Sequence, residues 1–221
     1  MHKLKGAGVY MSNKNGREFF FRKLHSLLGV IPVGIFLTQH LVVNHFATNG
    51  ATSFNKAAEF MANLPFRYFL EVFVIFLPIL YHAIYGLYIA FTGTSNVKNY
   101  GYLRNWLYLF QRISGVVTLI FITWHVWQTR IAAQMGATVD YNMMADIFTS
   151  KFMLVFYIVG VISTIFHFAN GLWSFFVSWG ITVTPRSQRI STYVTLGIFV
   201  VLSFVGLTAI FAFIDPQLAN L

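Results

Sequence analysis

Five long apolar stretches, separated by short polar segments, dominate the pattern of hydrophobic and polar positions along this chain. Numbered I to V, they run over residues Leu24–Phe46, Tyr68–Phe91, Trp106–Gln128, Phe152–Ser178 and Ile190–Ile214. About 20 mostly apolar residues in a helix cross a hydrocarbon core of about 30 Å, so each stretch predicts one membrane-spanning helix. We expect an all-α, polytopic membrane protein with a polar tail (residues 1–23), one five-helix transmembrane domain (24–214) and a short C-terminal tail (215–221).

The composition supports this class over the others. Hydrophobic residues make up 57% of the 221 residues and charged residues only 10%, against about a quarter charged in an ordinary soluble domain. So much apolar surface excludes a soluble globule of this size and an intrinsically disordered chain. Cysteine is absent, which excludes disulfides, thiolate metal sites and covalently attached haem.

The distribution of Lys and Arg predicts how the helices are oriented. The N-terminal tail and connections II–III and IV–V carry Lys3, Lys5, Lys14, Arg17, Arg22, Lys23, Lys98, Arg104, Arg186 and Arg189. Connections I–II and III–IV carry only Lys56, Arg67, Arg130 and Lys151. Because Lys and Arg are enriched on the cytoplasmic side, we expect the N-terminus in the cytoplasm and the C-terminus outside.

Histidines lie deep in four of the predicted spans. Spans I to IV carry one each, namely His40, His82, His125 and His167. Ionisable side chains at this depth are costly and usually functional. A single one is as easily a hydrogen-bonded core residue, but one in each of four helices favours a shared site.

These histidines belong to an internal repeat of spans I–II in spans III–IV. His40 and His125 are 85 residues apart, and so are His82 and His167. The neighbours match as well: FLTQH ending at His40 resembles FITWH ending at His125, and YHAIYGLY from position 81 resembles FHFANGLW from position 166. Repeats two spans apart share one orientation, so their symmetry axis lies along the membrane normal. In a four-helix bundle this symmetry places His40 opposite His125, and His82 opposite His167.

The two pairs lie at two depths. At about 1.5 Å per residue, His40 and His125 (the outer pair) lie near the predicted external side, and His82 and His167 (the inner pair) near the cytoplasmic side. Facing imidazoles in a bundle core suit axial ligation of haem, whereas zinc or copper needs three or four converging ligands. The sequence therefore predicts two bis-histidine haems of the b type, with these four histidines as iron ligands.

Two glycines lie close to the inner pair in the sequence. Gly86 and Gly171 each follow an inner-pair histidine by one helical turn and share its helix face. The missing side chain suits either the close passage of a flat porphyrin or tight helix packing in the membrane.

Several polar residues at the cytoplasmic side are candidates for the haem propionates. Arg112 lies about 9 Å into span III, level with the inner pair. Its charge needs either an anion such as a propionate or a path by which the side chain snorkels to the headgroups. His25, Ser26 and Arg22, at the start of span I, are either further propionate partners or ordinary interfacial residues.

Four further segments are distinctive: FRKLHSLLGV from position 21, LPFRY from 64, RIAAQMG from 130 and TPRSQRI from 184. With the histidine repeat, they make the chain resemble, from about Arg17 through span V, the di-haem cytochrome b membrane-anchor subunits of succinate dehydrogenase (succinate:menaquinone reductase) of Gram-positive bacteria. The resemblance implies five transmembrane helices in the bacterial plasma membrane. It also implies two haems b, with His40 and His125 on the outer haem and His82 and His167 on the inner one.

The resemblance further implies two cytoplasmic partners, a flavoprotein subunit that holds the succinate site and an iron–sulfur subunit. Electrons would pass from the iron–sulfur subunit through the inner and then the outer haem to menaquinone near the outer side. Candidate quinone-site residues at the outer ends of spans I–IV are Gln39, Asn44, Arg67, Tyr68, Glu71, Trp124 and Gln128. Glu71, the only acid within a span, is either a proton relay or an interfacial partner of Arg67 one turn away.

Some alternatives stay open at this stage. The related fumarate reductases carry a glutamate two residues before the haem ligand of span IV, where this chain has Ile165, so a proton path through that acid is not expected. The residues by themselves also fit a di-haem cytochrome b anchor of a fumarate reductase, hydrogenase or formate dehydrogenase. A haem-free transporter built from parallel repeats is the remaining class.

Overall fold

The computed structural model describes the backbone of residues 4–220 and the side chains of residues 16–220. Lys3 and Leu221, in the two predicted tails, lie outside this range, as do the side chains of Lys5 and Lys14. Within the described chain, five helical segments are long and apolar enough to cross a membrane: Gly16–Asn49, Arg67–Thr92, Leu103–Gln134, Lys151–Ser178 and Pro185–Ala212. The predicted all-α, five-helix architecture is confirmed, and span I begins eight residues earlier than predicted.

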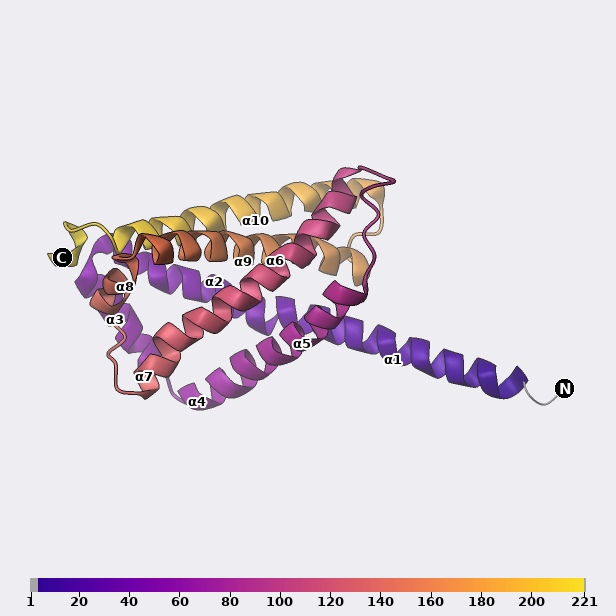
Figure 1. Cartoon of the computed structure of the whole chain (residues 1–221), viewed down its shortest axis with the longest axis horizontal. Helices are drawn as coiled ribbons and strands as arrows, with labels where there is room; N and C mark the ends of the chain where they lie inside the picture. Colours follow the sequence, from indigo (N-terminus) through magenta and orange to yellow (C-terminus); the bar gives the residue numbers. More distant parts are fainter. Residues whose placement is uncertain (1–3, 221) are drawn as a thin grey trace.

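The main helices are α1 (Leu4–Val30), α2 (Pro32–His45), α5 (Leu77–Thr92), α6 (Leu103–Val126), α9 (Lys151–Ser178) and α10 (Pro185–Ala212). The shorter ones are α3 (Ala51–Ala62), α4 (Arg67–Phe69), α7 (Ala132–Gln134) and α8 (Tyr141–Phe148). Two π-helical turns, η2 (Leu70–Phe76) and η3 (Trp127–Ile131), and two 3₁₀ turns, η1 (Phe46–Asn49) and η4 (Leu218–Asn220), complete the described elements. The predicted N-terminal tail is thus helical from Leu4 onward and continuous with span I, and α1 projects beyond the other helices (Figure 1).

Two prolines explain the breaks in spans I and II. The residue before a proline is disfavoured in the helical conformation, and α1 ends at Val30, just before Ile31 and Pro32. Pro78 lacks an N–H, and its ring crowds the carbonyl four residues earlier. The turn before it widens into the π-helical η2. Each break changes the phase of its helix, so residues on either side no longer follow one face.

The fifth spanning helix, α10, packs against α2 and α9. A methyl group on Gly206 of α10 would come within 2.9 Å of Val161 Cγ1 on α9 and 3.3 Å of Leu41 Cδ2 on α2. The same contact encloses Ile165, which is fully buried beside Leu41 and Leu202. The position two residues before His167 is therefore held by an apolar residue in an apolar contact.

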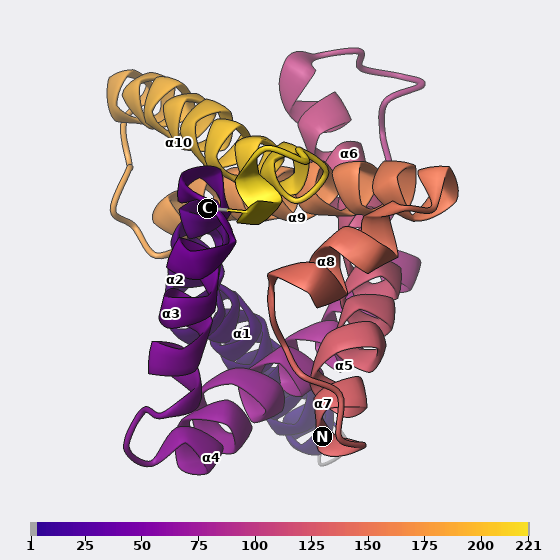
Figure 2. The same cartoon turned by 90° about the vertical axis from the view of Figure 1, so that its left-hand side faces the viewer.

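A cap of α3, α8 and the segment after α10 covers the end of the bundle where the C-terminus lies (Figures 1 and 2). Tyr141 is buried there, with its hydroxyl donating to the Ala212 carbonyl (2.5 Å) and its amide to Asn55 Oδ1 (2.8 Å). Asp140 accepts from the Met143 amide and caps α8, a contribution of about 1 kcal/mol. The buried core of this α3–α8 cap includes Ala47, Phe54, Tyr141, Met144, Phe148, Tyr157, Ile210, Ala212 and Phe213.

Candidate functional site

The four span histidines meet as two facing pairs. His40 on α2 and His125 on α6 have ring centroids 5.7 Å apart, with the ring planes at 72°. His82 on α5 and His167 on α9 have centroids 6.0 Å apart, at 86°. In each pair one helix comes from spans I–II and the other from spans III–IV, as the repeat requires.

In the inner pair, both rings are held by backbone carbonyls. His82 Nδ1 lies 2.9 Å from the His25 carbonyl oxygen, and His167 Nδ1 lies 3.0 Å from that of Gln111. A carbonyl can only accept, so both rings carry their proton on Nδ1, and the lone pair of Nε2 is left available. This is the arrangement typical of histidines that bind a metal.

In the outer pair, the ring contacts come from side chains and differ between the two histidines. His125 Nδ1 lies 3.3 Å from the Tyr157 hydroxyl, which donates to Gln128 Oε1 (3.2 Å). Asn44 donates to the His40 carbonyl (2.8 Å), and its amide nitrogen lies 3.4 Å from His40 Nε2. Within the described chain, only His125 of this pair thus has a partner on Nδ1, and that partner is a side chain that a substitution can remove. The Asn44 amide instead lies at the His40 Nε2 atom that would bind iron.

The two pairs fit haem b. A metal lies about 2 Å from an imidazole nitrogen, so two axial ligands of one iron have nitrogens about 4 Å apart and ring centres somewhat farther. The centroid separations of 5.7 and 6.0 Å agree with this geometry. The donor set also fits, because each pair offers two imidazoles and at least one of them has Nδ1 already hydrogen-bonded.

Glycines make room for the inner pair. A methyl group on Gly29 would overlap the His82 ring, and one on Gly115 would lie 2.9 Å from His167 Cε1. A methyl group on Gly86 or Gly171 would lie 3.1 Å from the Nε2 atom of His25 or Gln111, respectively. Gly86 and Gly171 therefore leave space for these two side chains, and their predicted contact with a porphyrin stays a prediction.

The three propionate candidates at the start of span I differ in how close they lie to the inner pair. The ring of His25 stacks on that of His82, with centroids 4.0 Å apart and planes at 10°. Its Nε2 is buried without a hydrogen-bond partner, which leaves it free for a polar group of a ligand. Ser26 accepts from Trp179 Nε1 (3.1 Å), and Arg22 pairs with Glu18 (2.8 Å) in an exposed contact. Of the three, only His25 touches a predicted iron ligand.

Arg112 has partners within the protein. Its guanidinium donates to the carbonyls of Ala90 and Gly93 at the carboxyl end of α5. Cations at a helix C-terminus are stabilised by the exposed carbonyls and the helix dipole. Its Nε is buried without a partner, so the predicted propionate contact stays open for that atom.

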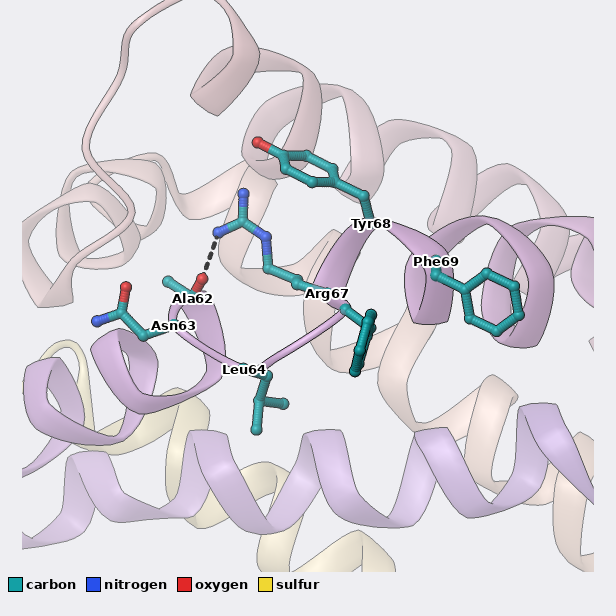
Figure 3. A pocket seen from close by; sticks show the side chains of 7 residues that line it. Ala62, Asn63, Leu64, Arg67, Tyr68 and Phe69 are labelled. Carbon is teal, nitrogen blue, oxygen red and sulfur yellow. Dashed lines mark hydrogen bonds between the residues drawn. The ribbon is translucent and has the colours of Figure 1, made fainter.

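Two of the quinone candidates join a charge cluster between spans II and III. Arg130, which the sequence assigned only to a connection, donates to Glu71 (2.6 Å), and Arg67 lies 3.7 Å from the same carboxylate. Figure 3 shows the Arg67 guanidinium reaching the Ala62 carbonyl (2.7 Å); it also lies 4.7 Å from the centre of the Tyr68 ring. The cluster borders a shallow cavity of about 440 Å³ lined by Ala62, Asn63, Leu64, Phe66, Arg67, Tyr68 and Phe69.

The other candidates are spread over the outer half of the bundle. Tyr68 and Trp124 are 63% and 45% exposed. The Gln39 amide lies 3.2 Å from Met61 Sδ, and Gln39 lines a separate shallow groove with Val30, Gly34, Ile35, Thr38 and Phe168. Asn44 and Gln128 lie beside the outer pair. The seven residues therefore do not form one site.

Sequence reasoning missed the residues that support the ligands. Gln111 and Gly115 follow His25 and Gly29 by 86 residues, one more than the ligand repeat. Searching for a second spacing beside 85 would have found both. The offset is consistent with the break at Pro32, since eleven positions separate Gly29 from His40 but only ten separate Gly115 from His125.

Two comparisons with known proteins point to the same family. Residues 95–206 match the family described as succinate dehydrogenase/fumarate reductase transmembrane subunit. The chain is also 72% identical, over 198 residues, to the succinate dehydrogenase cytochrome b558 subunit of Bacillus subtilis (strain 168), an alignment that covers 90% of this chain and 98% of that protein.

Proposed function

The chain belongs to the family of succinate dehydrogenase/fumarate reductase transmembrane subunits, and on this premise we propose that it carries two bis-histidine haems b. It is the membrane-anchor and electron-transfer subunit of a succinate dehydrogenase, works with other subunits of that complex and spans a bacterial membrane several times. The number of haems, their ligands, the quinone and the identity of the partner subunits are our proposals.

One observation carries the two-haem proposal: two pairs of imidazoles face each other at separate levels of one bundle. Bound haem would supply one-electron transfer through an iron atom at each level. The chain's own residues hold three of the four imidazoles, those of His82, His125 and His167, in the tautomer that leaves Nε2 free. His25 and Arg112 would hold the propionates of the inner haem.

We expect the purified complex to contain two haems b for each copy of this chain. A pyridine haemochrome assay gives the haem type and, with the protein concentration, the ratio. A redox titration of the reduced-minus-oxidised spectrum should resolve two one-electron components. A ratio of one, or a spectrum of covalently attached haem, would overturn the proposal.

The partners proposed are a flavoprotein subunit that oxidises succinate and an iron–sulfur subunit, both on the cytoplasmic side. Support comes from the charge distribution, because the tail and the connections predicted to face the cytoplasm hold most of the Lys and Arg residues. On the projecting helix α1, Phe19 and Phe20 are 63% and 59% exposed beside Arg17. A basic surface with exposed aromatic side chains suits a protein partner.

We place menaquinone reduction beside the outer pair, with protons taken from outside. Menaquinone is a weaker oxidant than ubiquinone, and outward electron movement would let the membrane potential contribute about 2.3 kcal/mol per charge per 100 mV. Gln128 and Asn44 are the candidates nearest the outer pair, and the cluster of Arg67, Glu71 and Arg130 lies at the same end of spans II and III. The buried Ile165 offers no titratable group for a compensating proton path at that position.

In sealed vesicles with an imposed potential, succinate oxidation by menaquinone should slow when an uncoupler collapses that potential. The control is detergent-solubilised complex, in which the same uncoupler should have no effect. Equal rates in vesicles with and without the potential would exclude an outer quinone site, and so would a quinone analogue bound only beside the inner pair.

A further inference from the structure

We infer that the Tyr157 hydroxyl, held by Gln128, is a positioning residue that fixes the tautomer of His125 and tunes the outer haem. The inference rests on the proposed ligation of that haem by His40 and His125. It concerns a residue of α9 that carries no predicted ligand role and lies ten positions before the inner ligand His167 in the sequence.

The ring of Tyr157 is fixed by packing. It is 3% exposed, and edge-to-face contacts join it to Phe148 of the α3–α8 cap (5.0 Å between centroids) and to Phe121 of α6 (5.2 Å). Such contacts favour one ring orientation. The packing therefore holds the hydroxyl between His125 Nδ1 (3.3 Å) and Gln128 Oε1 (3.2 Å).

The direction of the hydrogen bonds follows from counting donors. A tyrosine hydroxyl has one proton to donate and lone pairs to accept. Gln128 Oε1 can only accept, so the Tyr157 proton points to it, and a lone pair of the hydroxyl faces His125. His125 must then carry its proton on Nδ1, which leaves Nε2 free for iron. If Gln128 did not accept, the hydroxyl could donate to Nδ1 instead and move the ring proton to Nε2.

The inner pair is held differently. Its two Nδ1 atoms donate to the carbonyls of His25 and Gln111, which cannot become donors and which no side-chain substitution removes. The Ser114 hydroxyl lies 3.5 Å from His167 Nδ1, but it donates its proton to the Gln111 carbonyl (3.1 Å). The two haem levels therefore differ in how firmly the ligand tautomer is fixed. The midpoint potential of the inner haem therefore serves as an internal reference, because a substitution at Tyr157 should leave it unchanged.

The consequence for the outer haem is a change in potential. A hydrogen bond from Nδ1 makes the imidazole a stronger electron donor, which stabilises ferric over ferrous iron. Removing the acceptor should therefore raise the midpoint potential of the outer haem. A tenfold change in the ratio of reduced to oxidised haem at a fixed potential corresponds to 59 mV for a one-electron couple.

The test is a redox titration of the purified complex with Tyr157→Phe. We expect the midpoint potential of the outer haem to rise by up to about 59 mV, which is a tenfold change in its ratio of reduced to oxidised haem at a fixed potential. The midpoint potential of the inner haem should stay unchanged. Loss of the outer haem alone would also support the inference, because the ligating tautomer would no longer be held. A second variant, Gln128→Leu, keeps the tyrosine but removes its acceptor, and it should move the same component.

Tyr141→Phe is the matched control. It removes the same atom from the same α3–α8 cap, but its hydroxyl donates to the Ala212 carbonyl and has no contact with His125. If Tyr141→Phe moves the outer component as far as Tyr157→Phe, loosening of the cap explains the shift and the inference fails. It also fails if Tyr157→Phe and Gln128→Leu both keep the outer haem at its wild-type potential. Wild-type complex with fewer than two haems would instead refute the proposed ligation itself.

Discussion

Replacing His40 or His125 by alanine is expected to remove one and the same haem, and replacing His82 or His167 to remove the other. Each substitution deletes one of the two imidazoles that we propose as ligands of one haem, which face each other at 5.7 Å in the outer pair and 6.0 Å in the inner pair. The expected result is a fall from two haems to about one per chain. A redox titration identifies which spectral component is lost.

His45→Ala is the control for the outer pair. His45 is in the same span as His40, but its Nδ1 faces Thr208 Oγ1 of α10 at 3.0 Å, so both haems should remain. Where alanine prevents assembly, His40→Met keeps an axial thioether ligand and should raise the potential of the outer component only. If the His40 and His82 variants lost the same spectral component, the pairing of His40 with His125 and of His82 with His167 would be wrong.

Adding one methyl group at Gly29 is expected to remove or severely weaken the inner haem. The methyl group of Gly29→Ala would overlap the His82 ring, and the ring cannot retreat easily because His25 stacks on it at 4.0 Å. Gly115→Ala should have a smaller effect of the same kind, since its methyl group would lie 2.9 Å from His167 Cε1. In both variants the outer component should persist.

Gly197→Ala provides the comparison. Gly197 lies inside α10, and a methyl group there would meet no atom within 4 Å. Because alanine is the better helix former by about 1 kcal/mol, this variant should keep both haems and lose no stability. The haem-to-protein ratio and the two midpoint potentials check all three variants. An intact inner haem at wild-type potential in Gly29→Ala would show that the His82 ring is not held against α1.

The sequence by itself determined the number of spans and the level and pairing of the histidines. These features depend on one-dimensional quantities. About 20 apolar residues are needed to cross the membrane, and a helix rises about 1.5 Å per residue, so positions convert directly into depth. The exact spacing of 85 between His40 and His125, and between His82 and His167, supplied the symmetry that pairs them.

Only the tertiary structure decided which groups surround those histidines. Contacts such as His82 with the His25 carbonyl, or Tyr157 with His125, depend on how each helix is rotated and tilted against its neighbours. That rotation changes at Pro32 and at the π-helical turns, where the periodicity of the sequence no longer predicts the face.

The same reason explains the charged residues. Glu71 could be paired with Arg67 from their spacing along one helix, but its shorter contact is with Arg130, 59 residues away on another span. Arg112 required a partner at its depth, and the carbonyls that end α5 provide one. Backbone groups at helix ends carry no residue-specific signal, so a sequence predicts that such a charge needs a partner, and the packing of the helices determines which group it is.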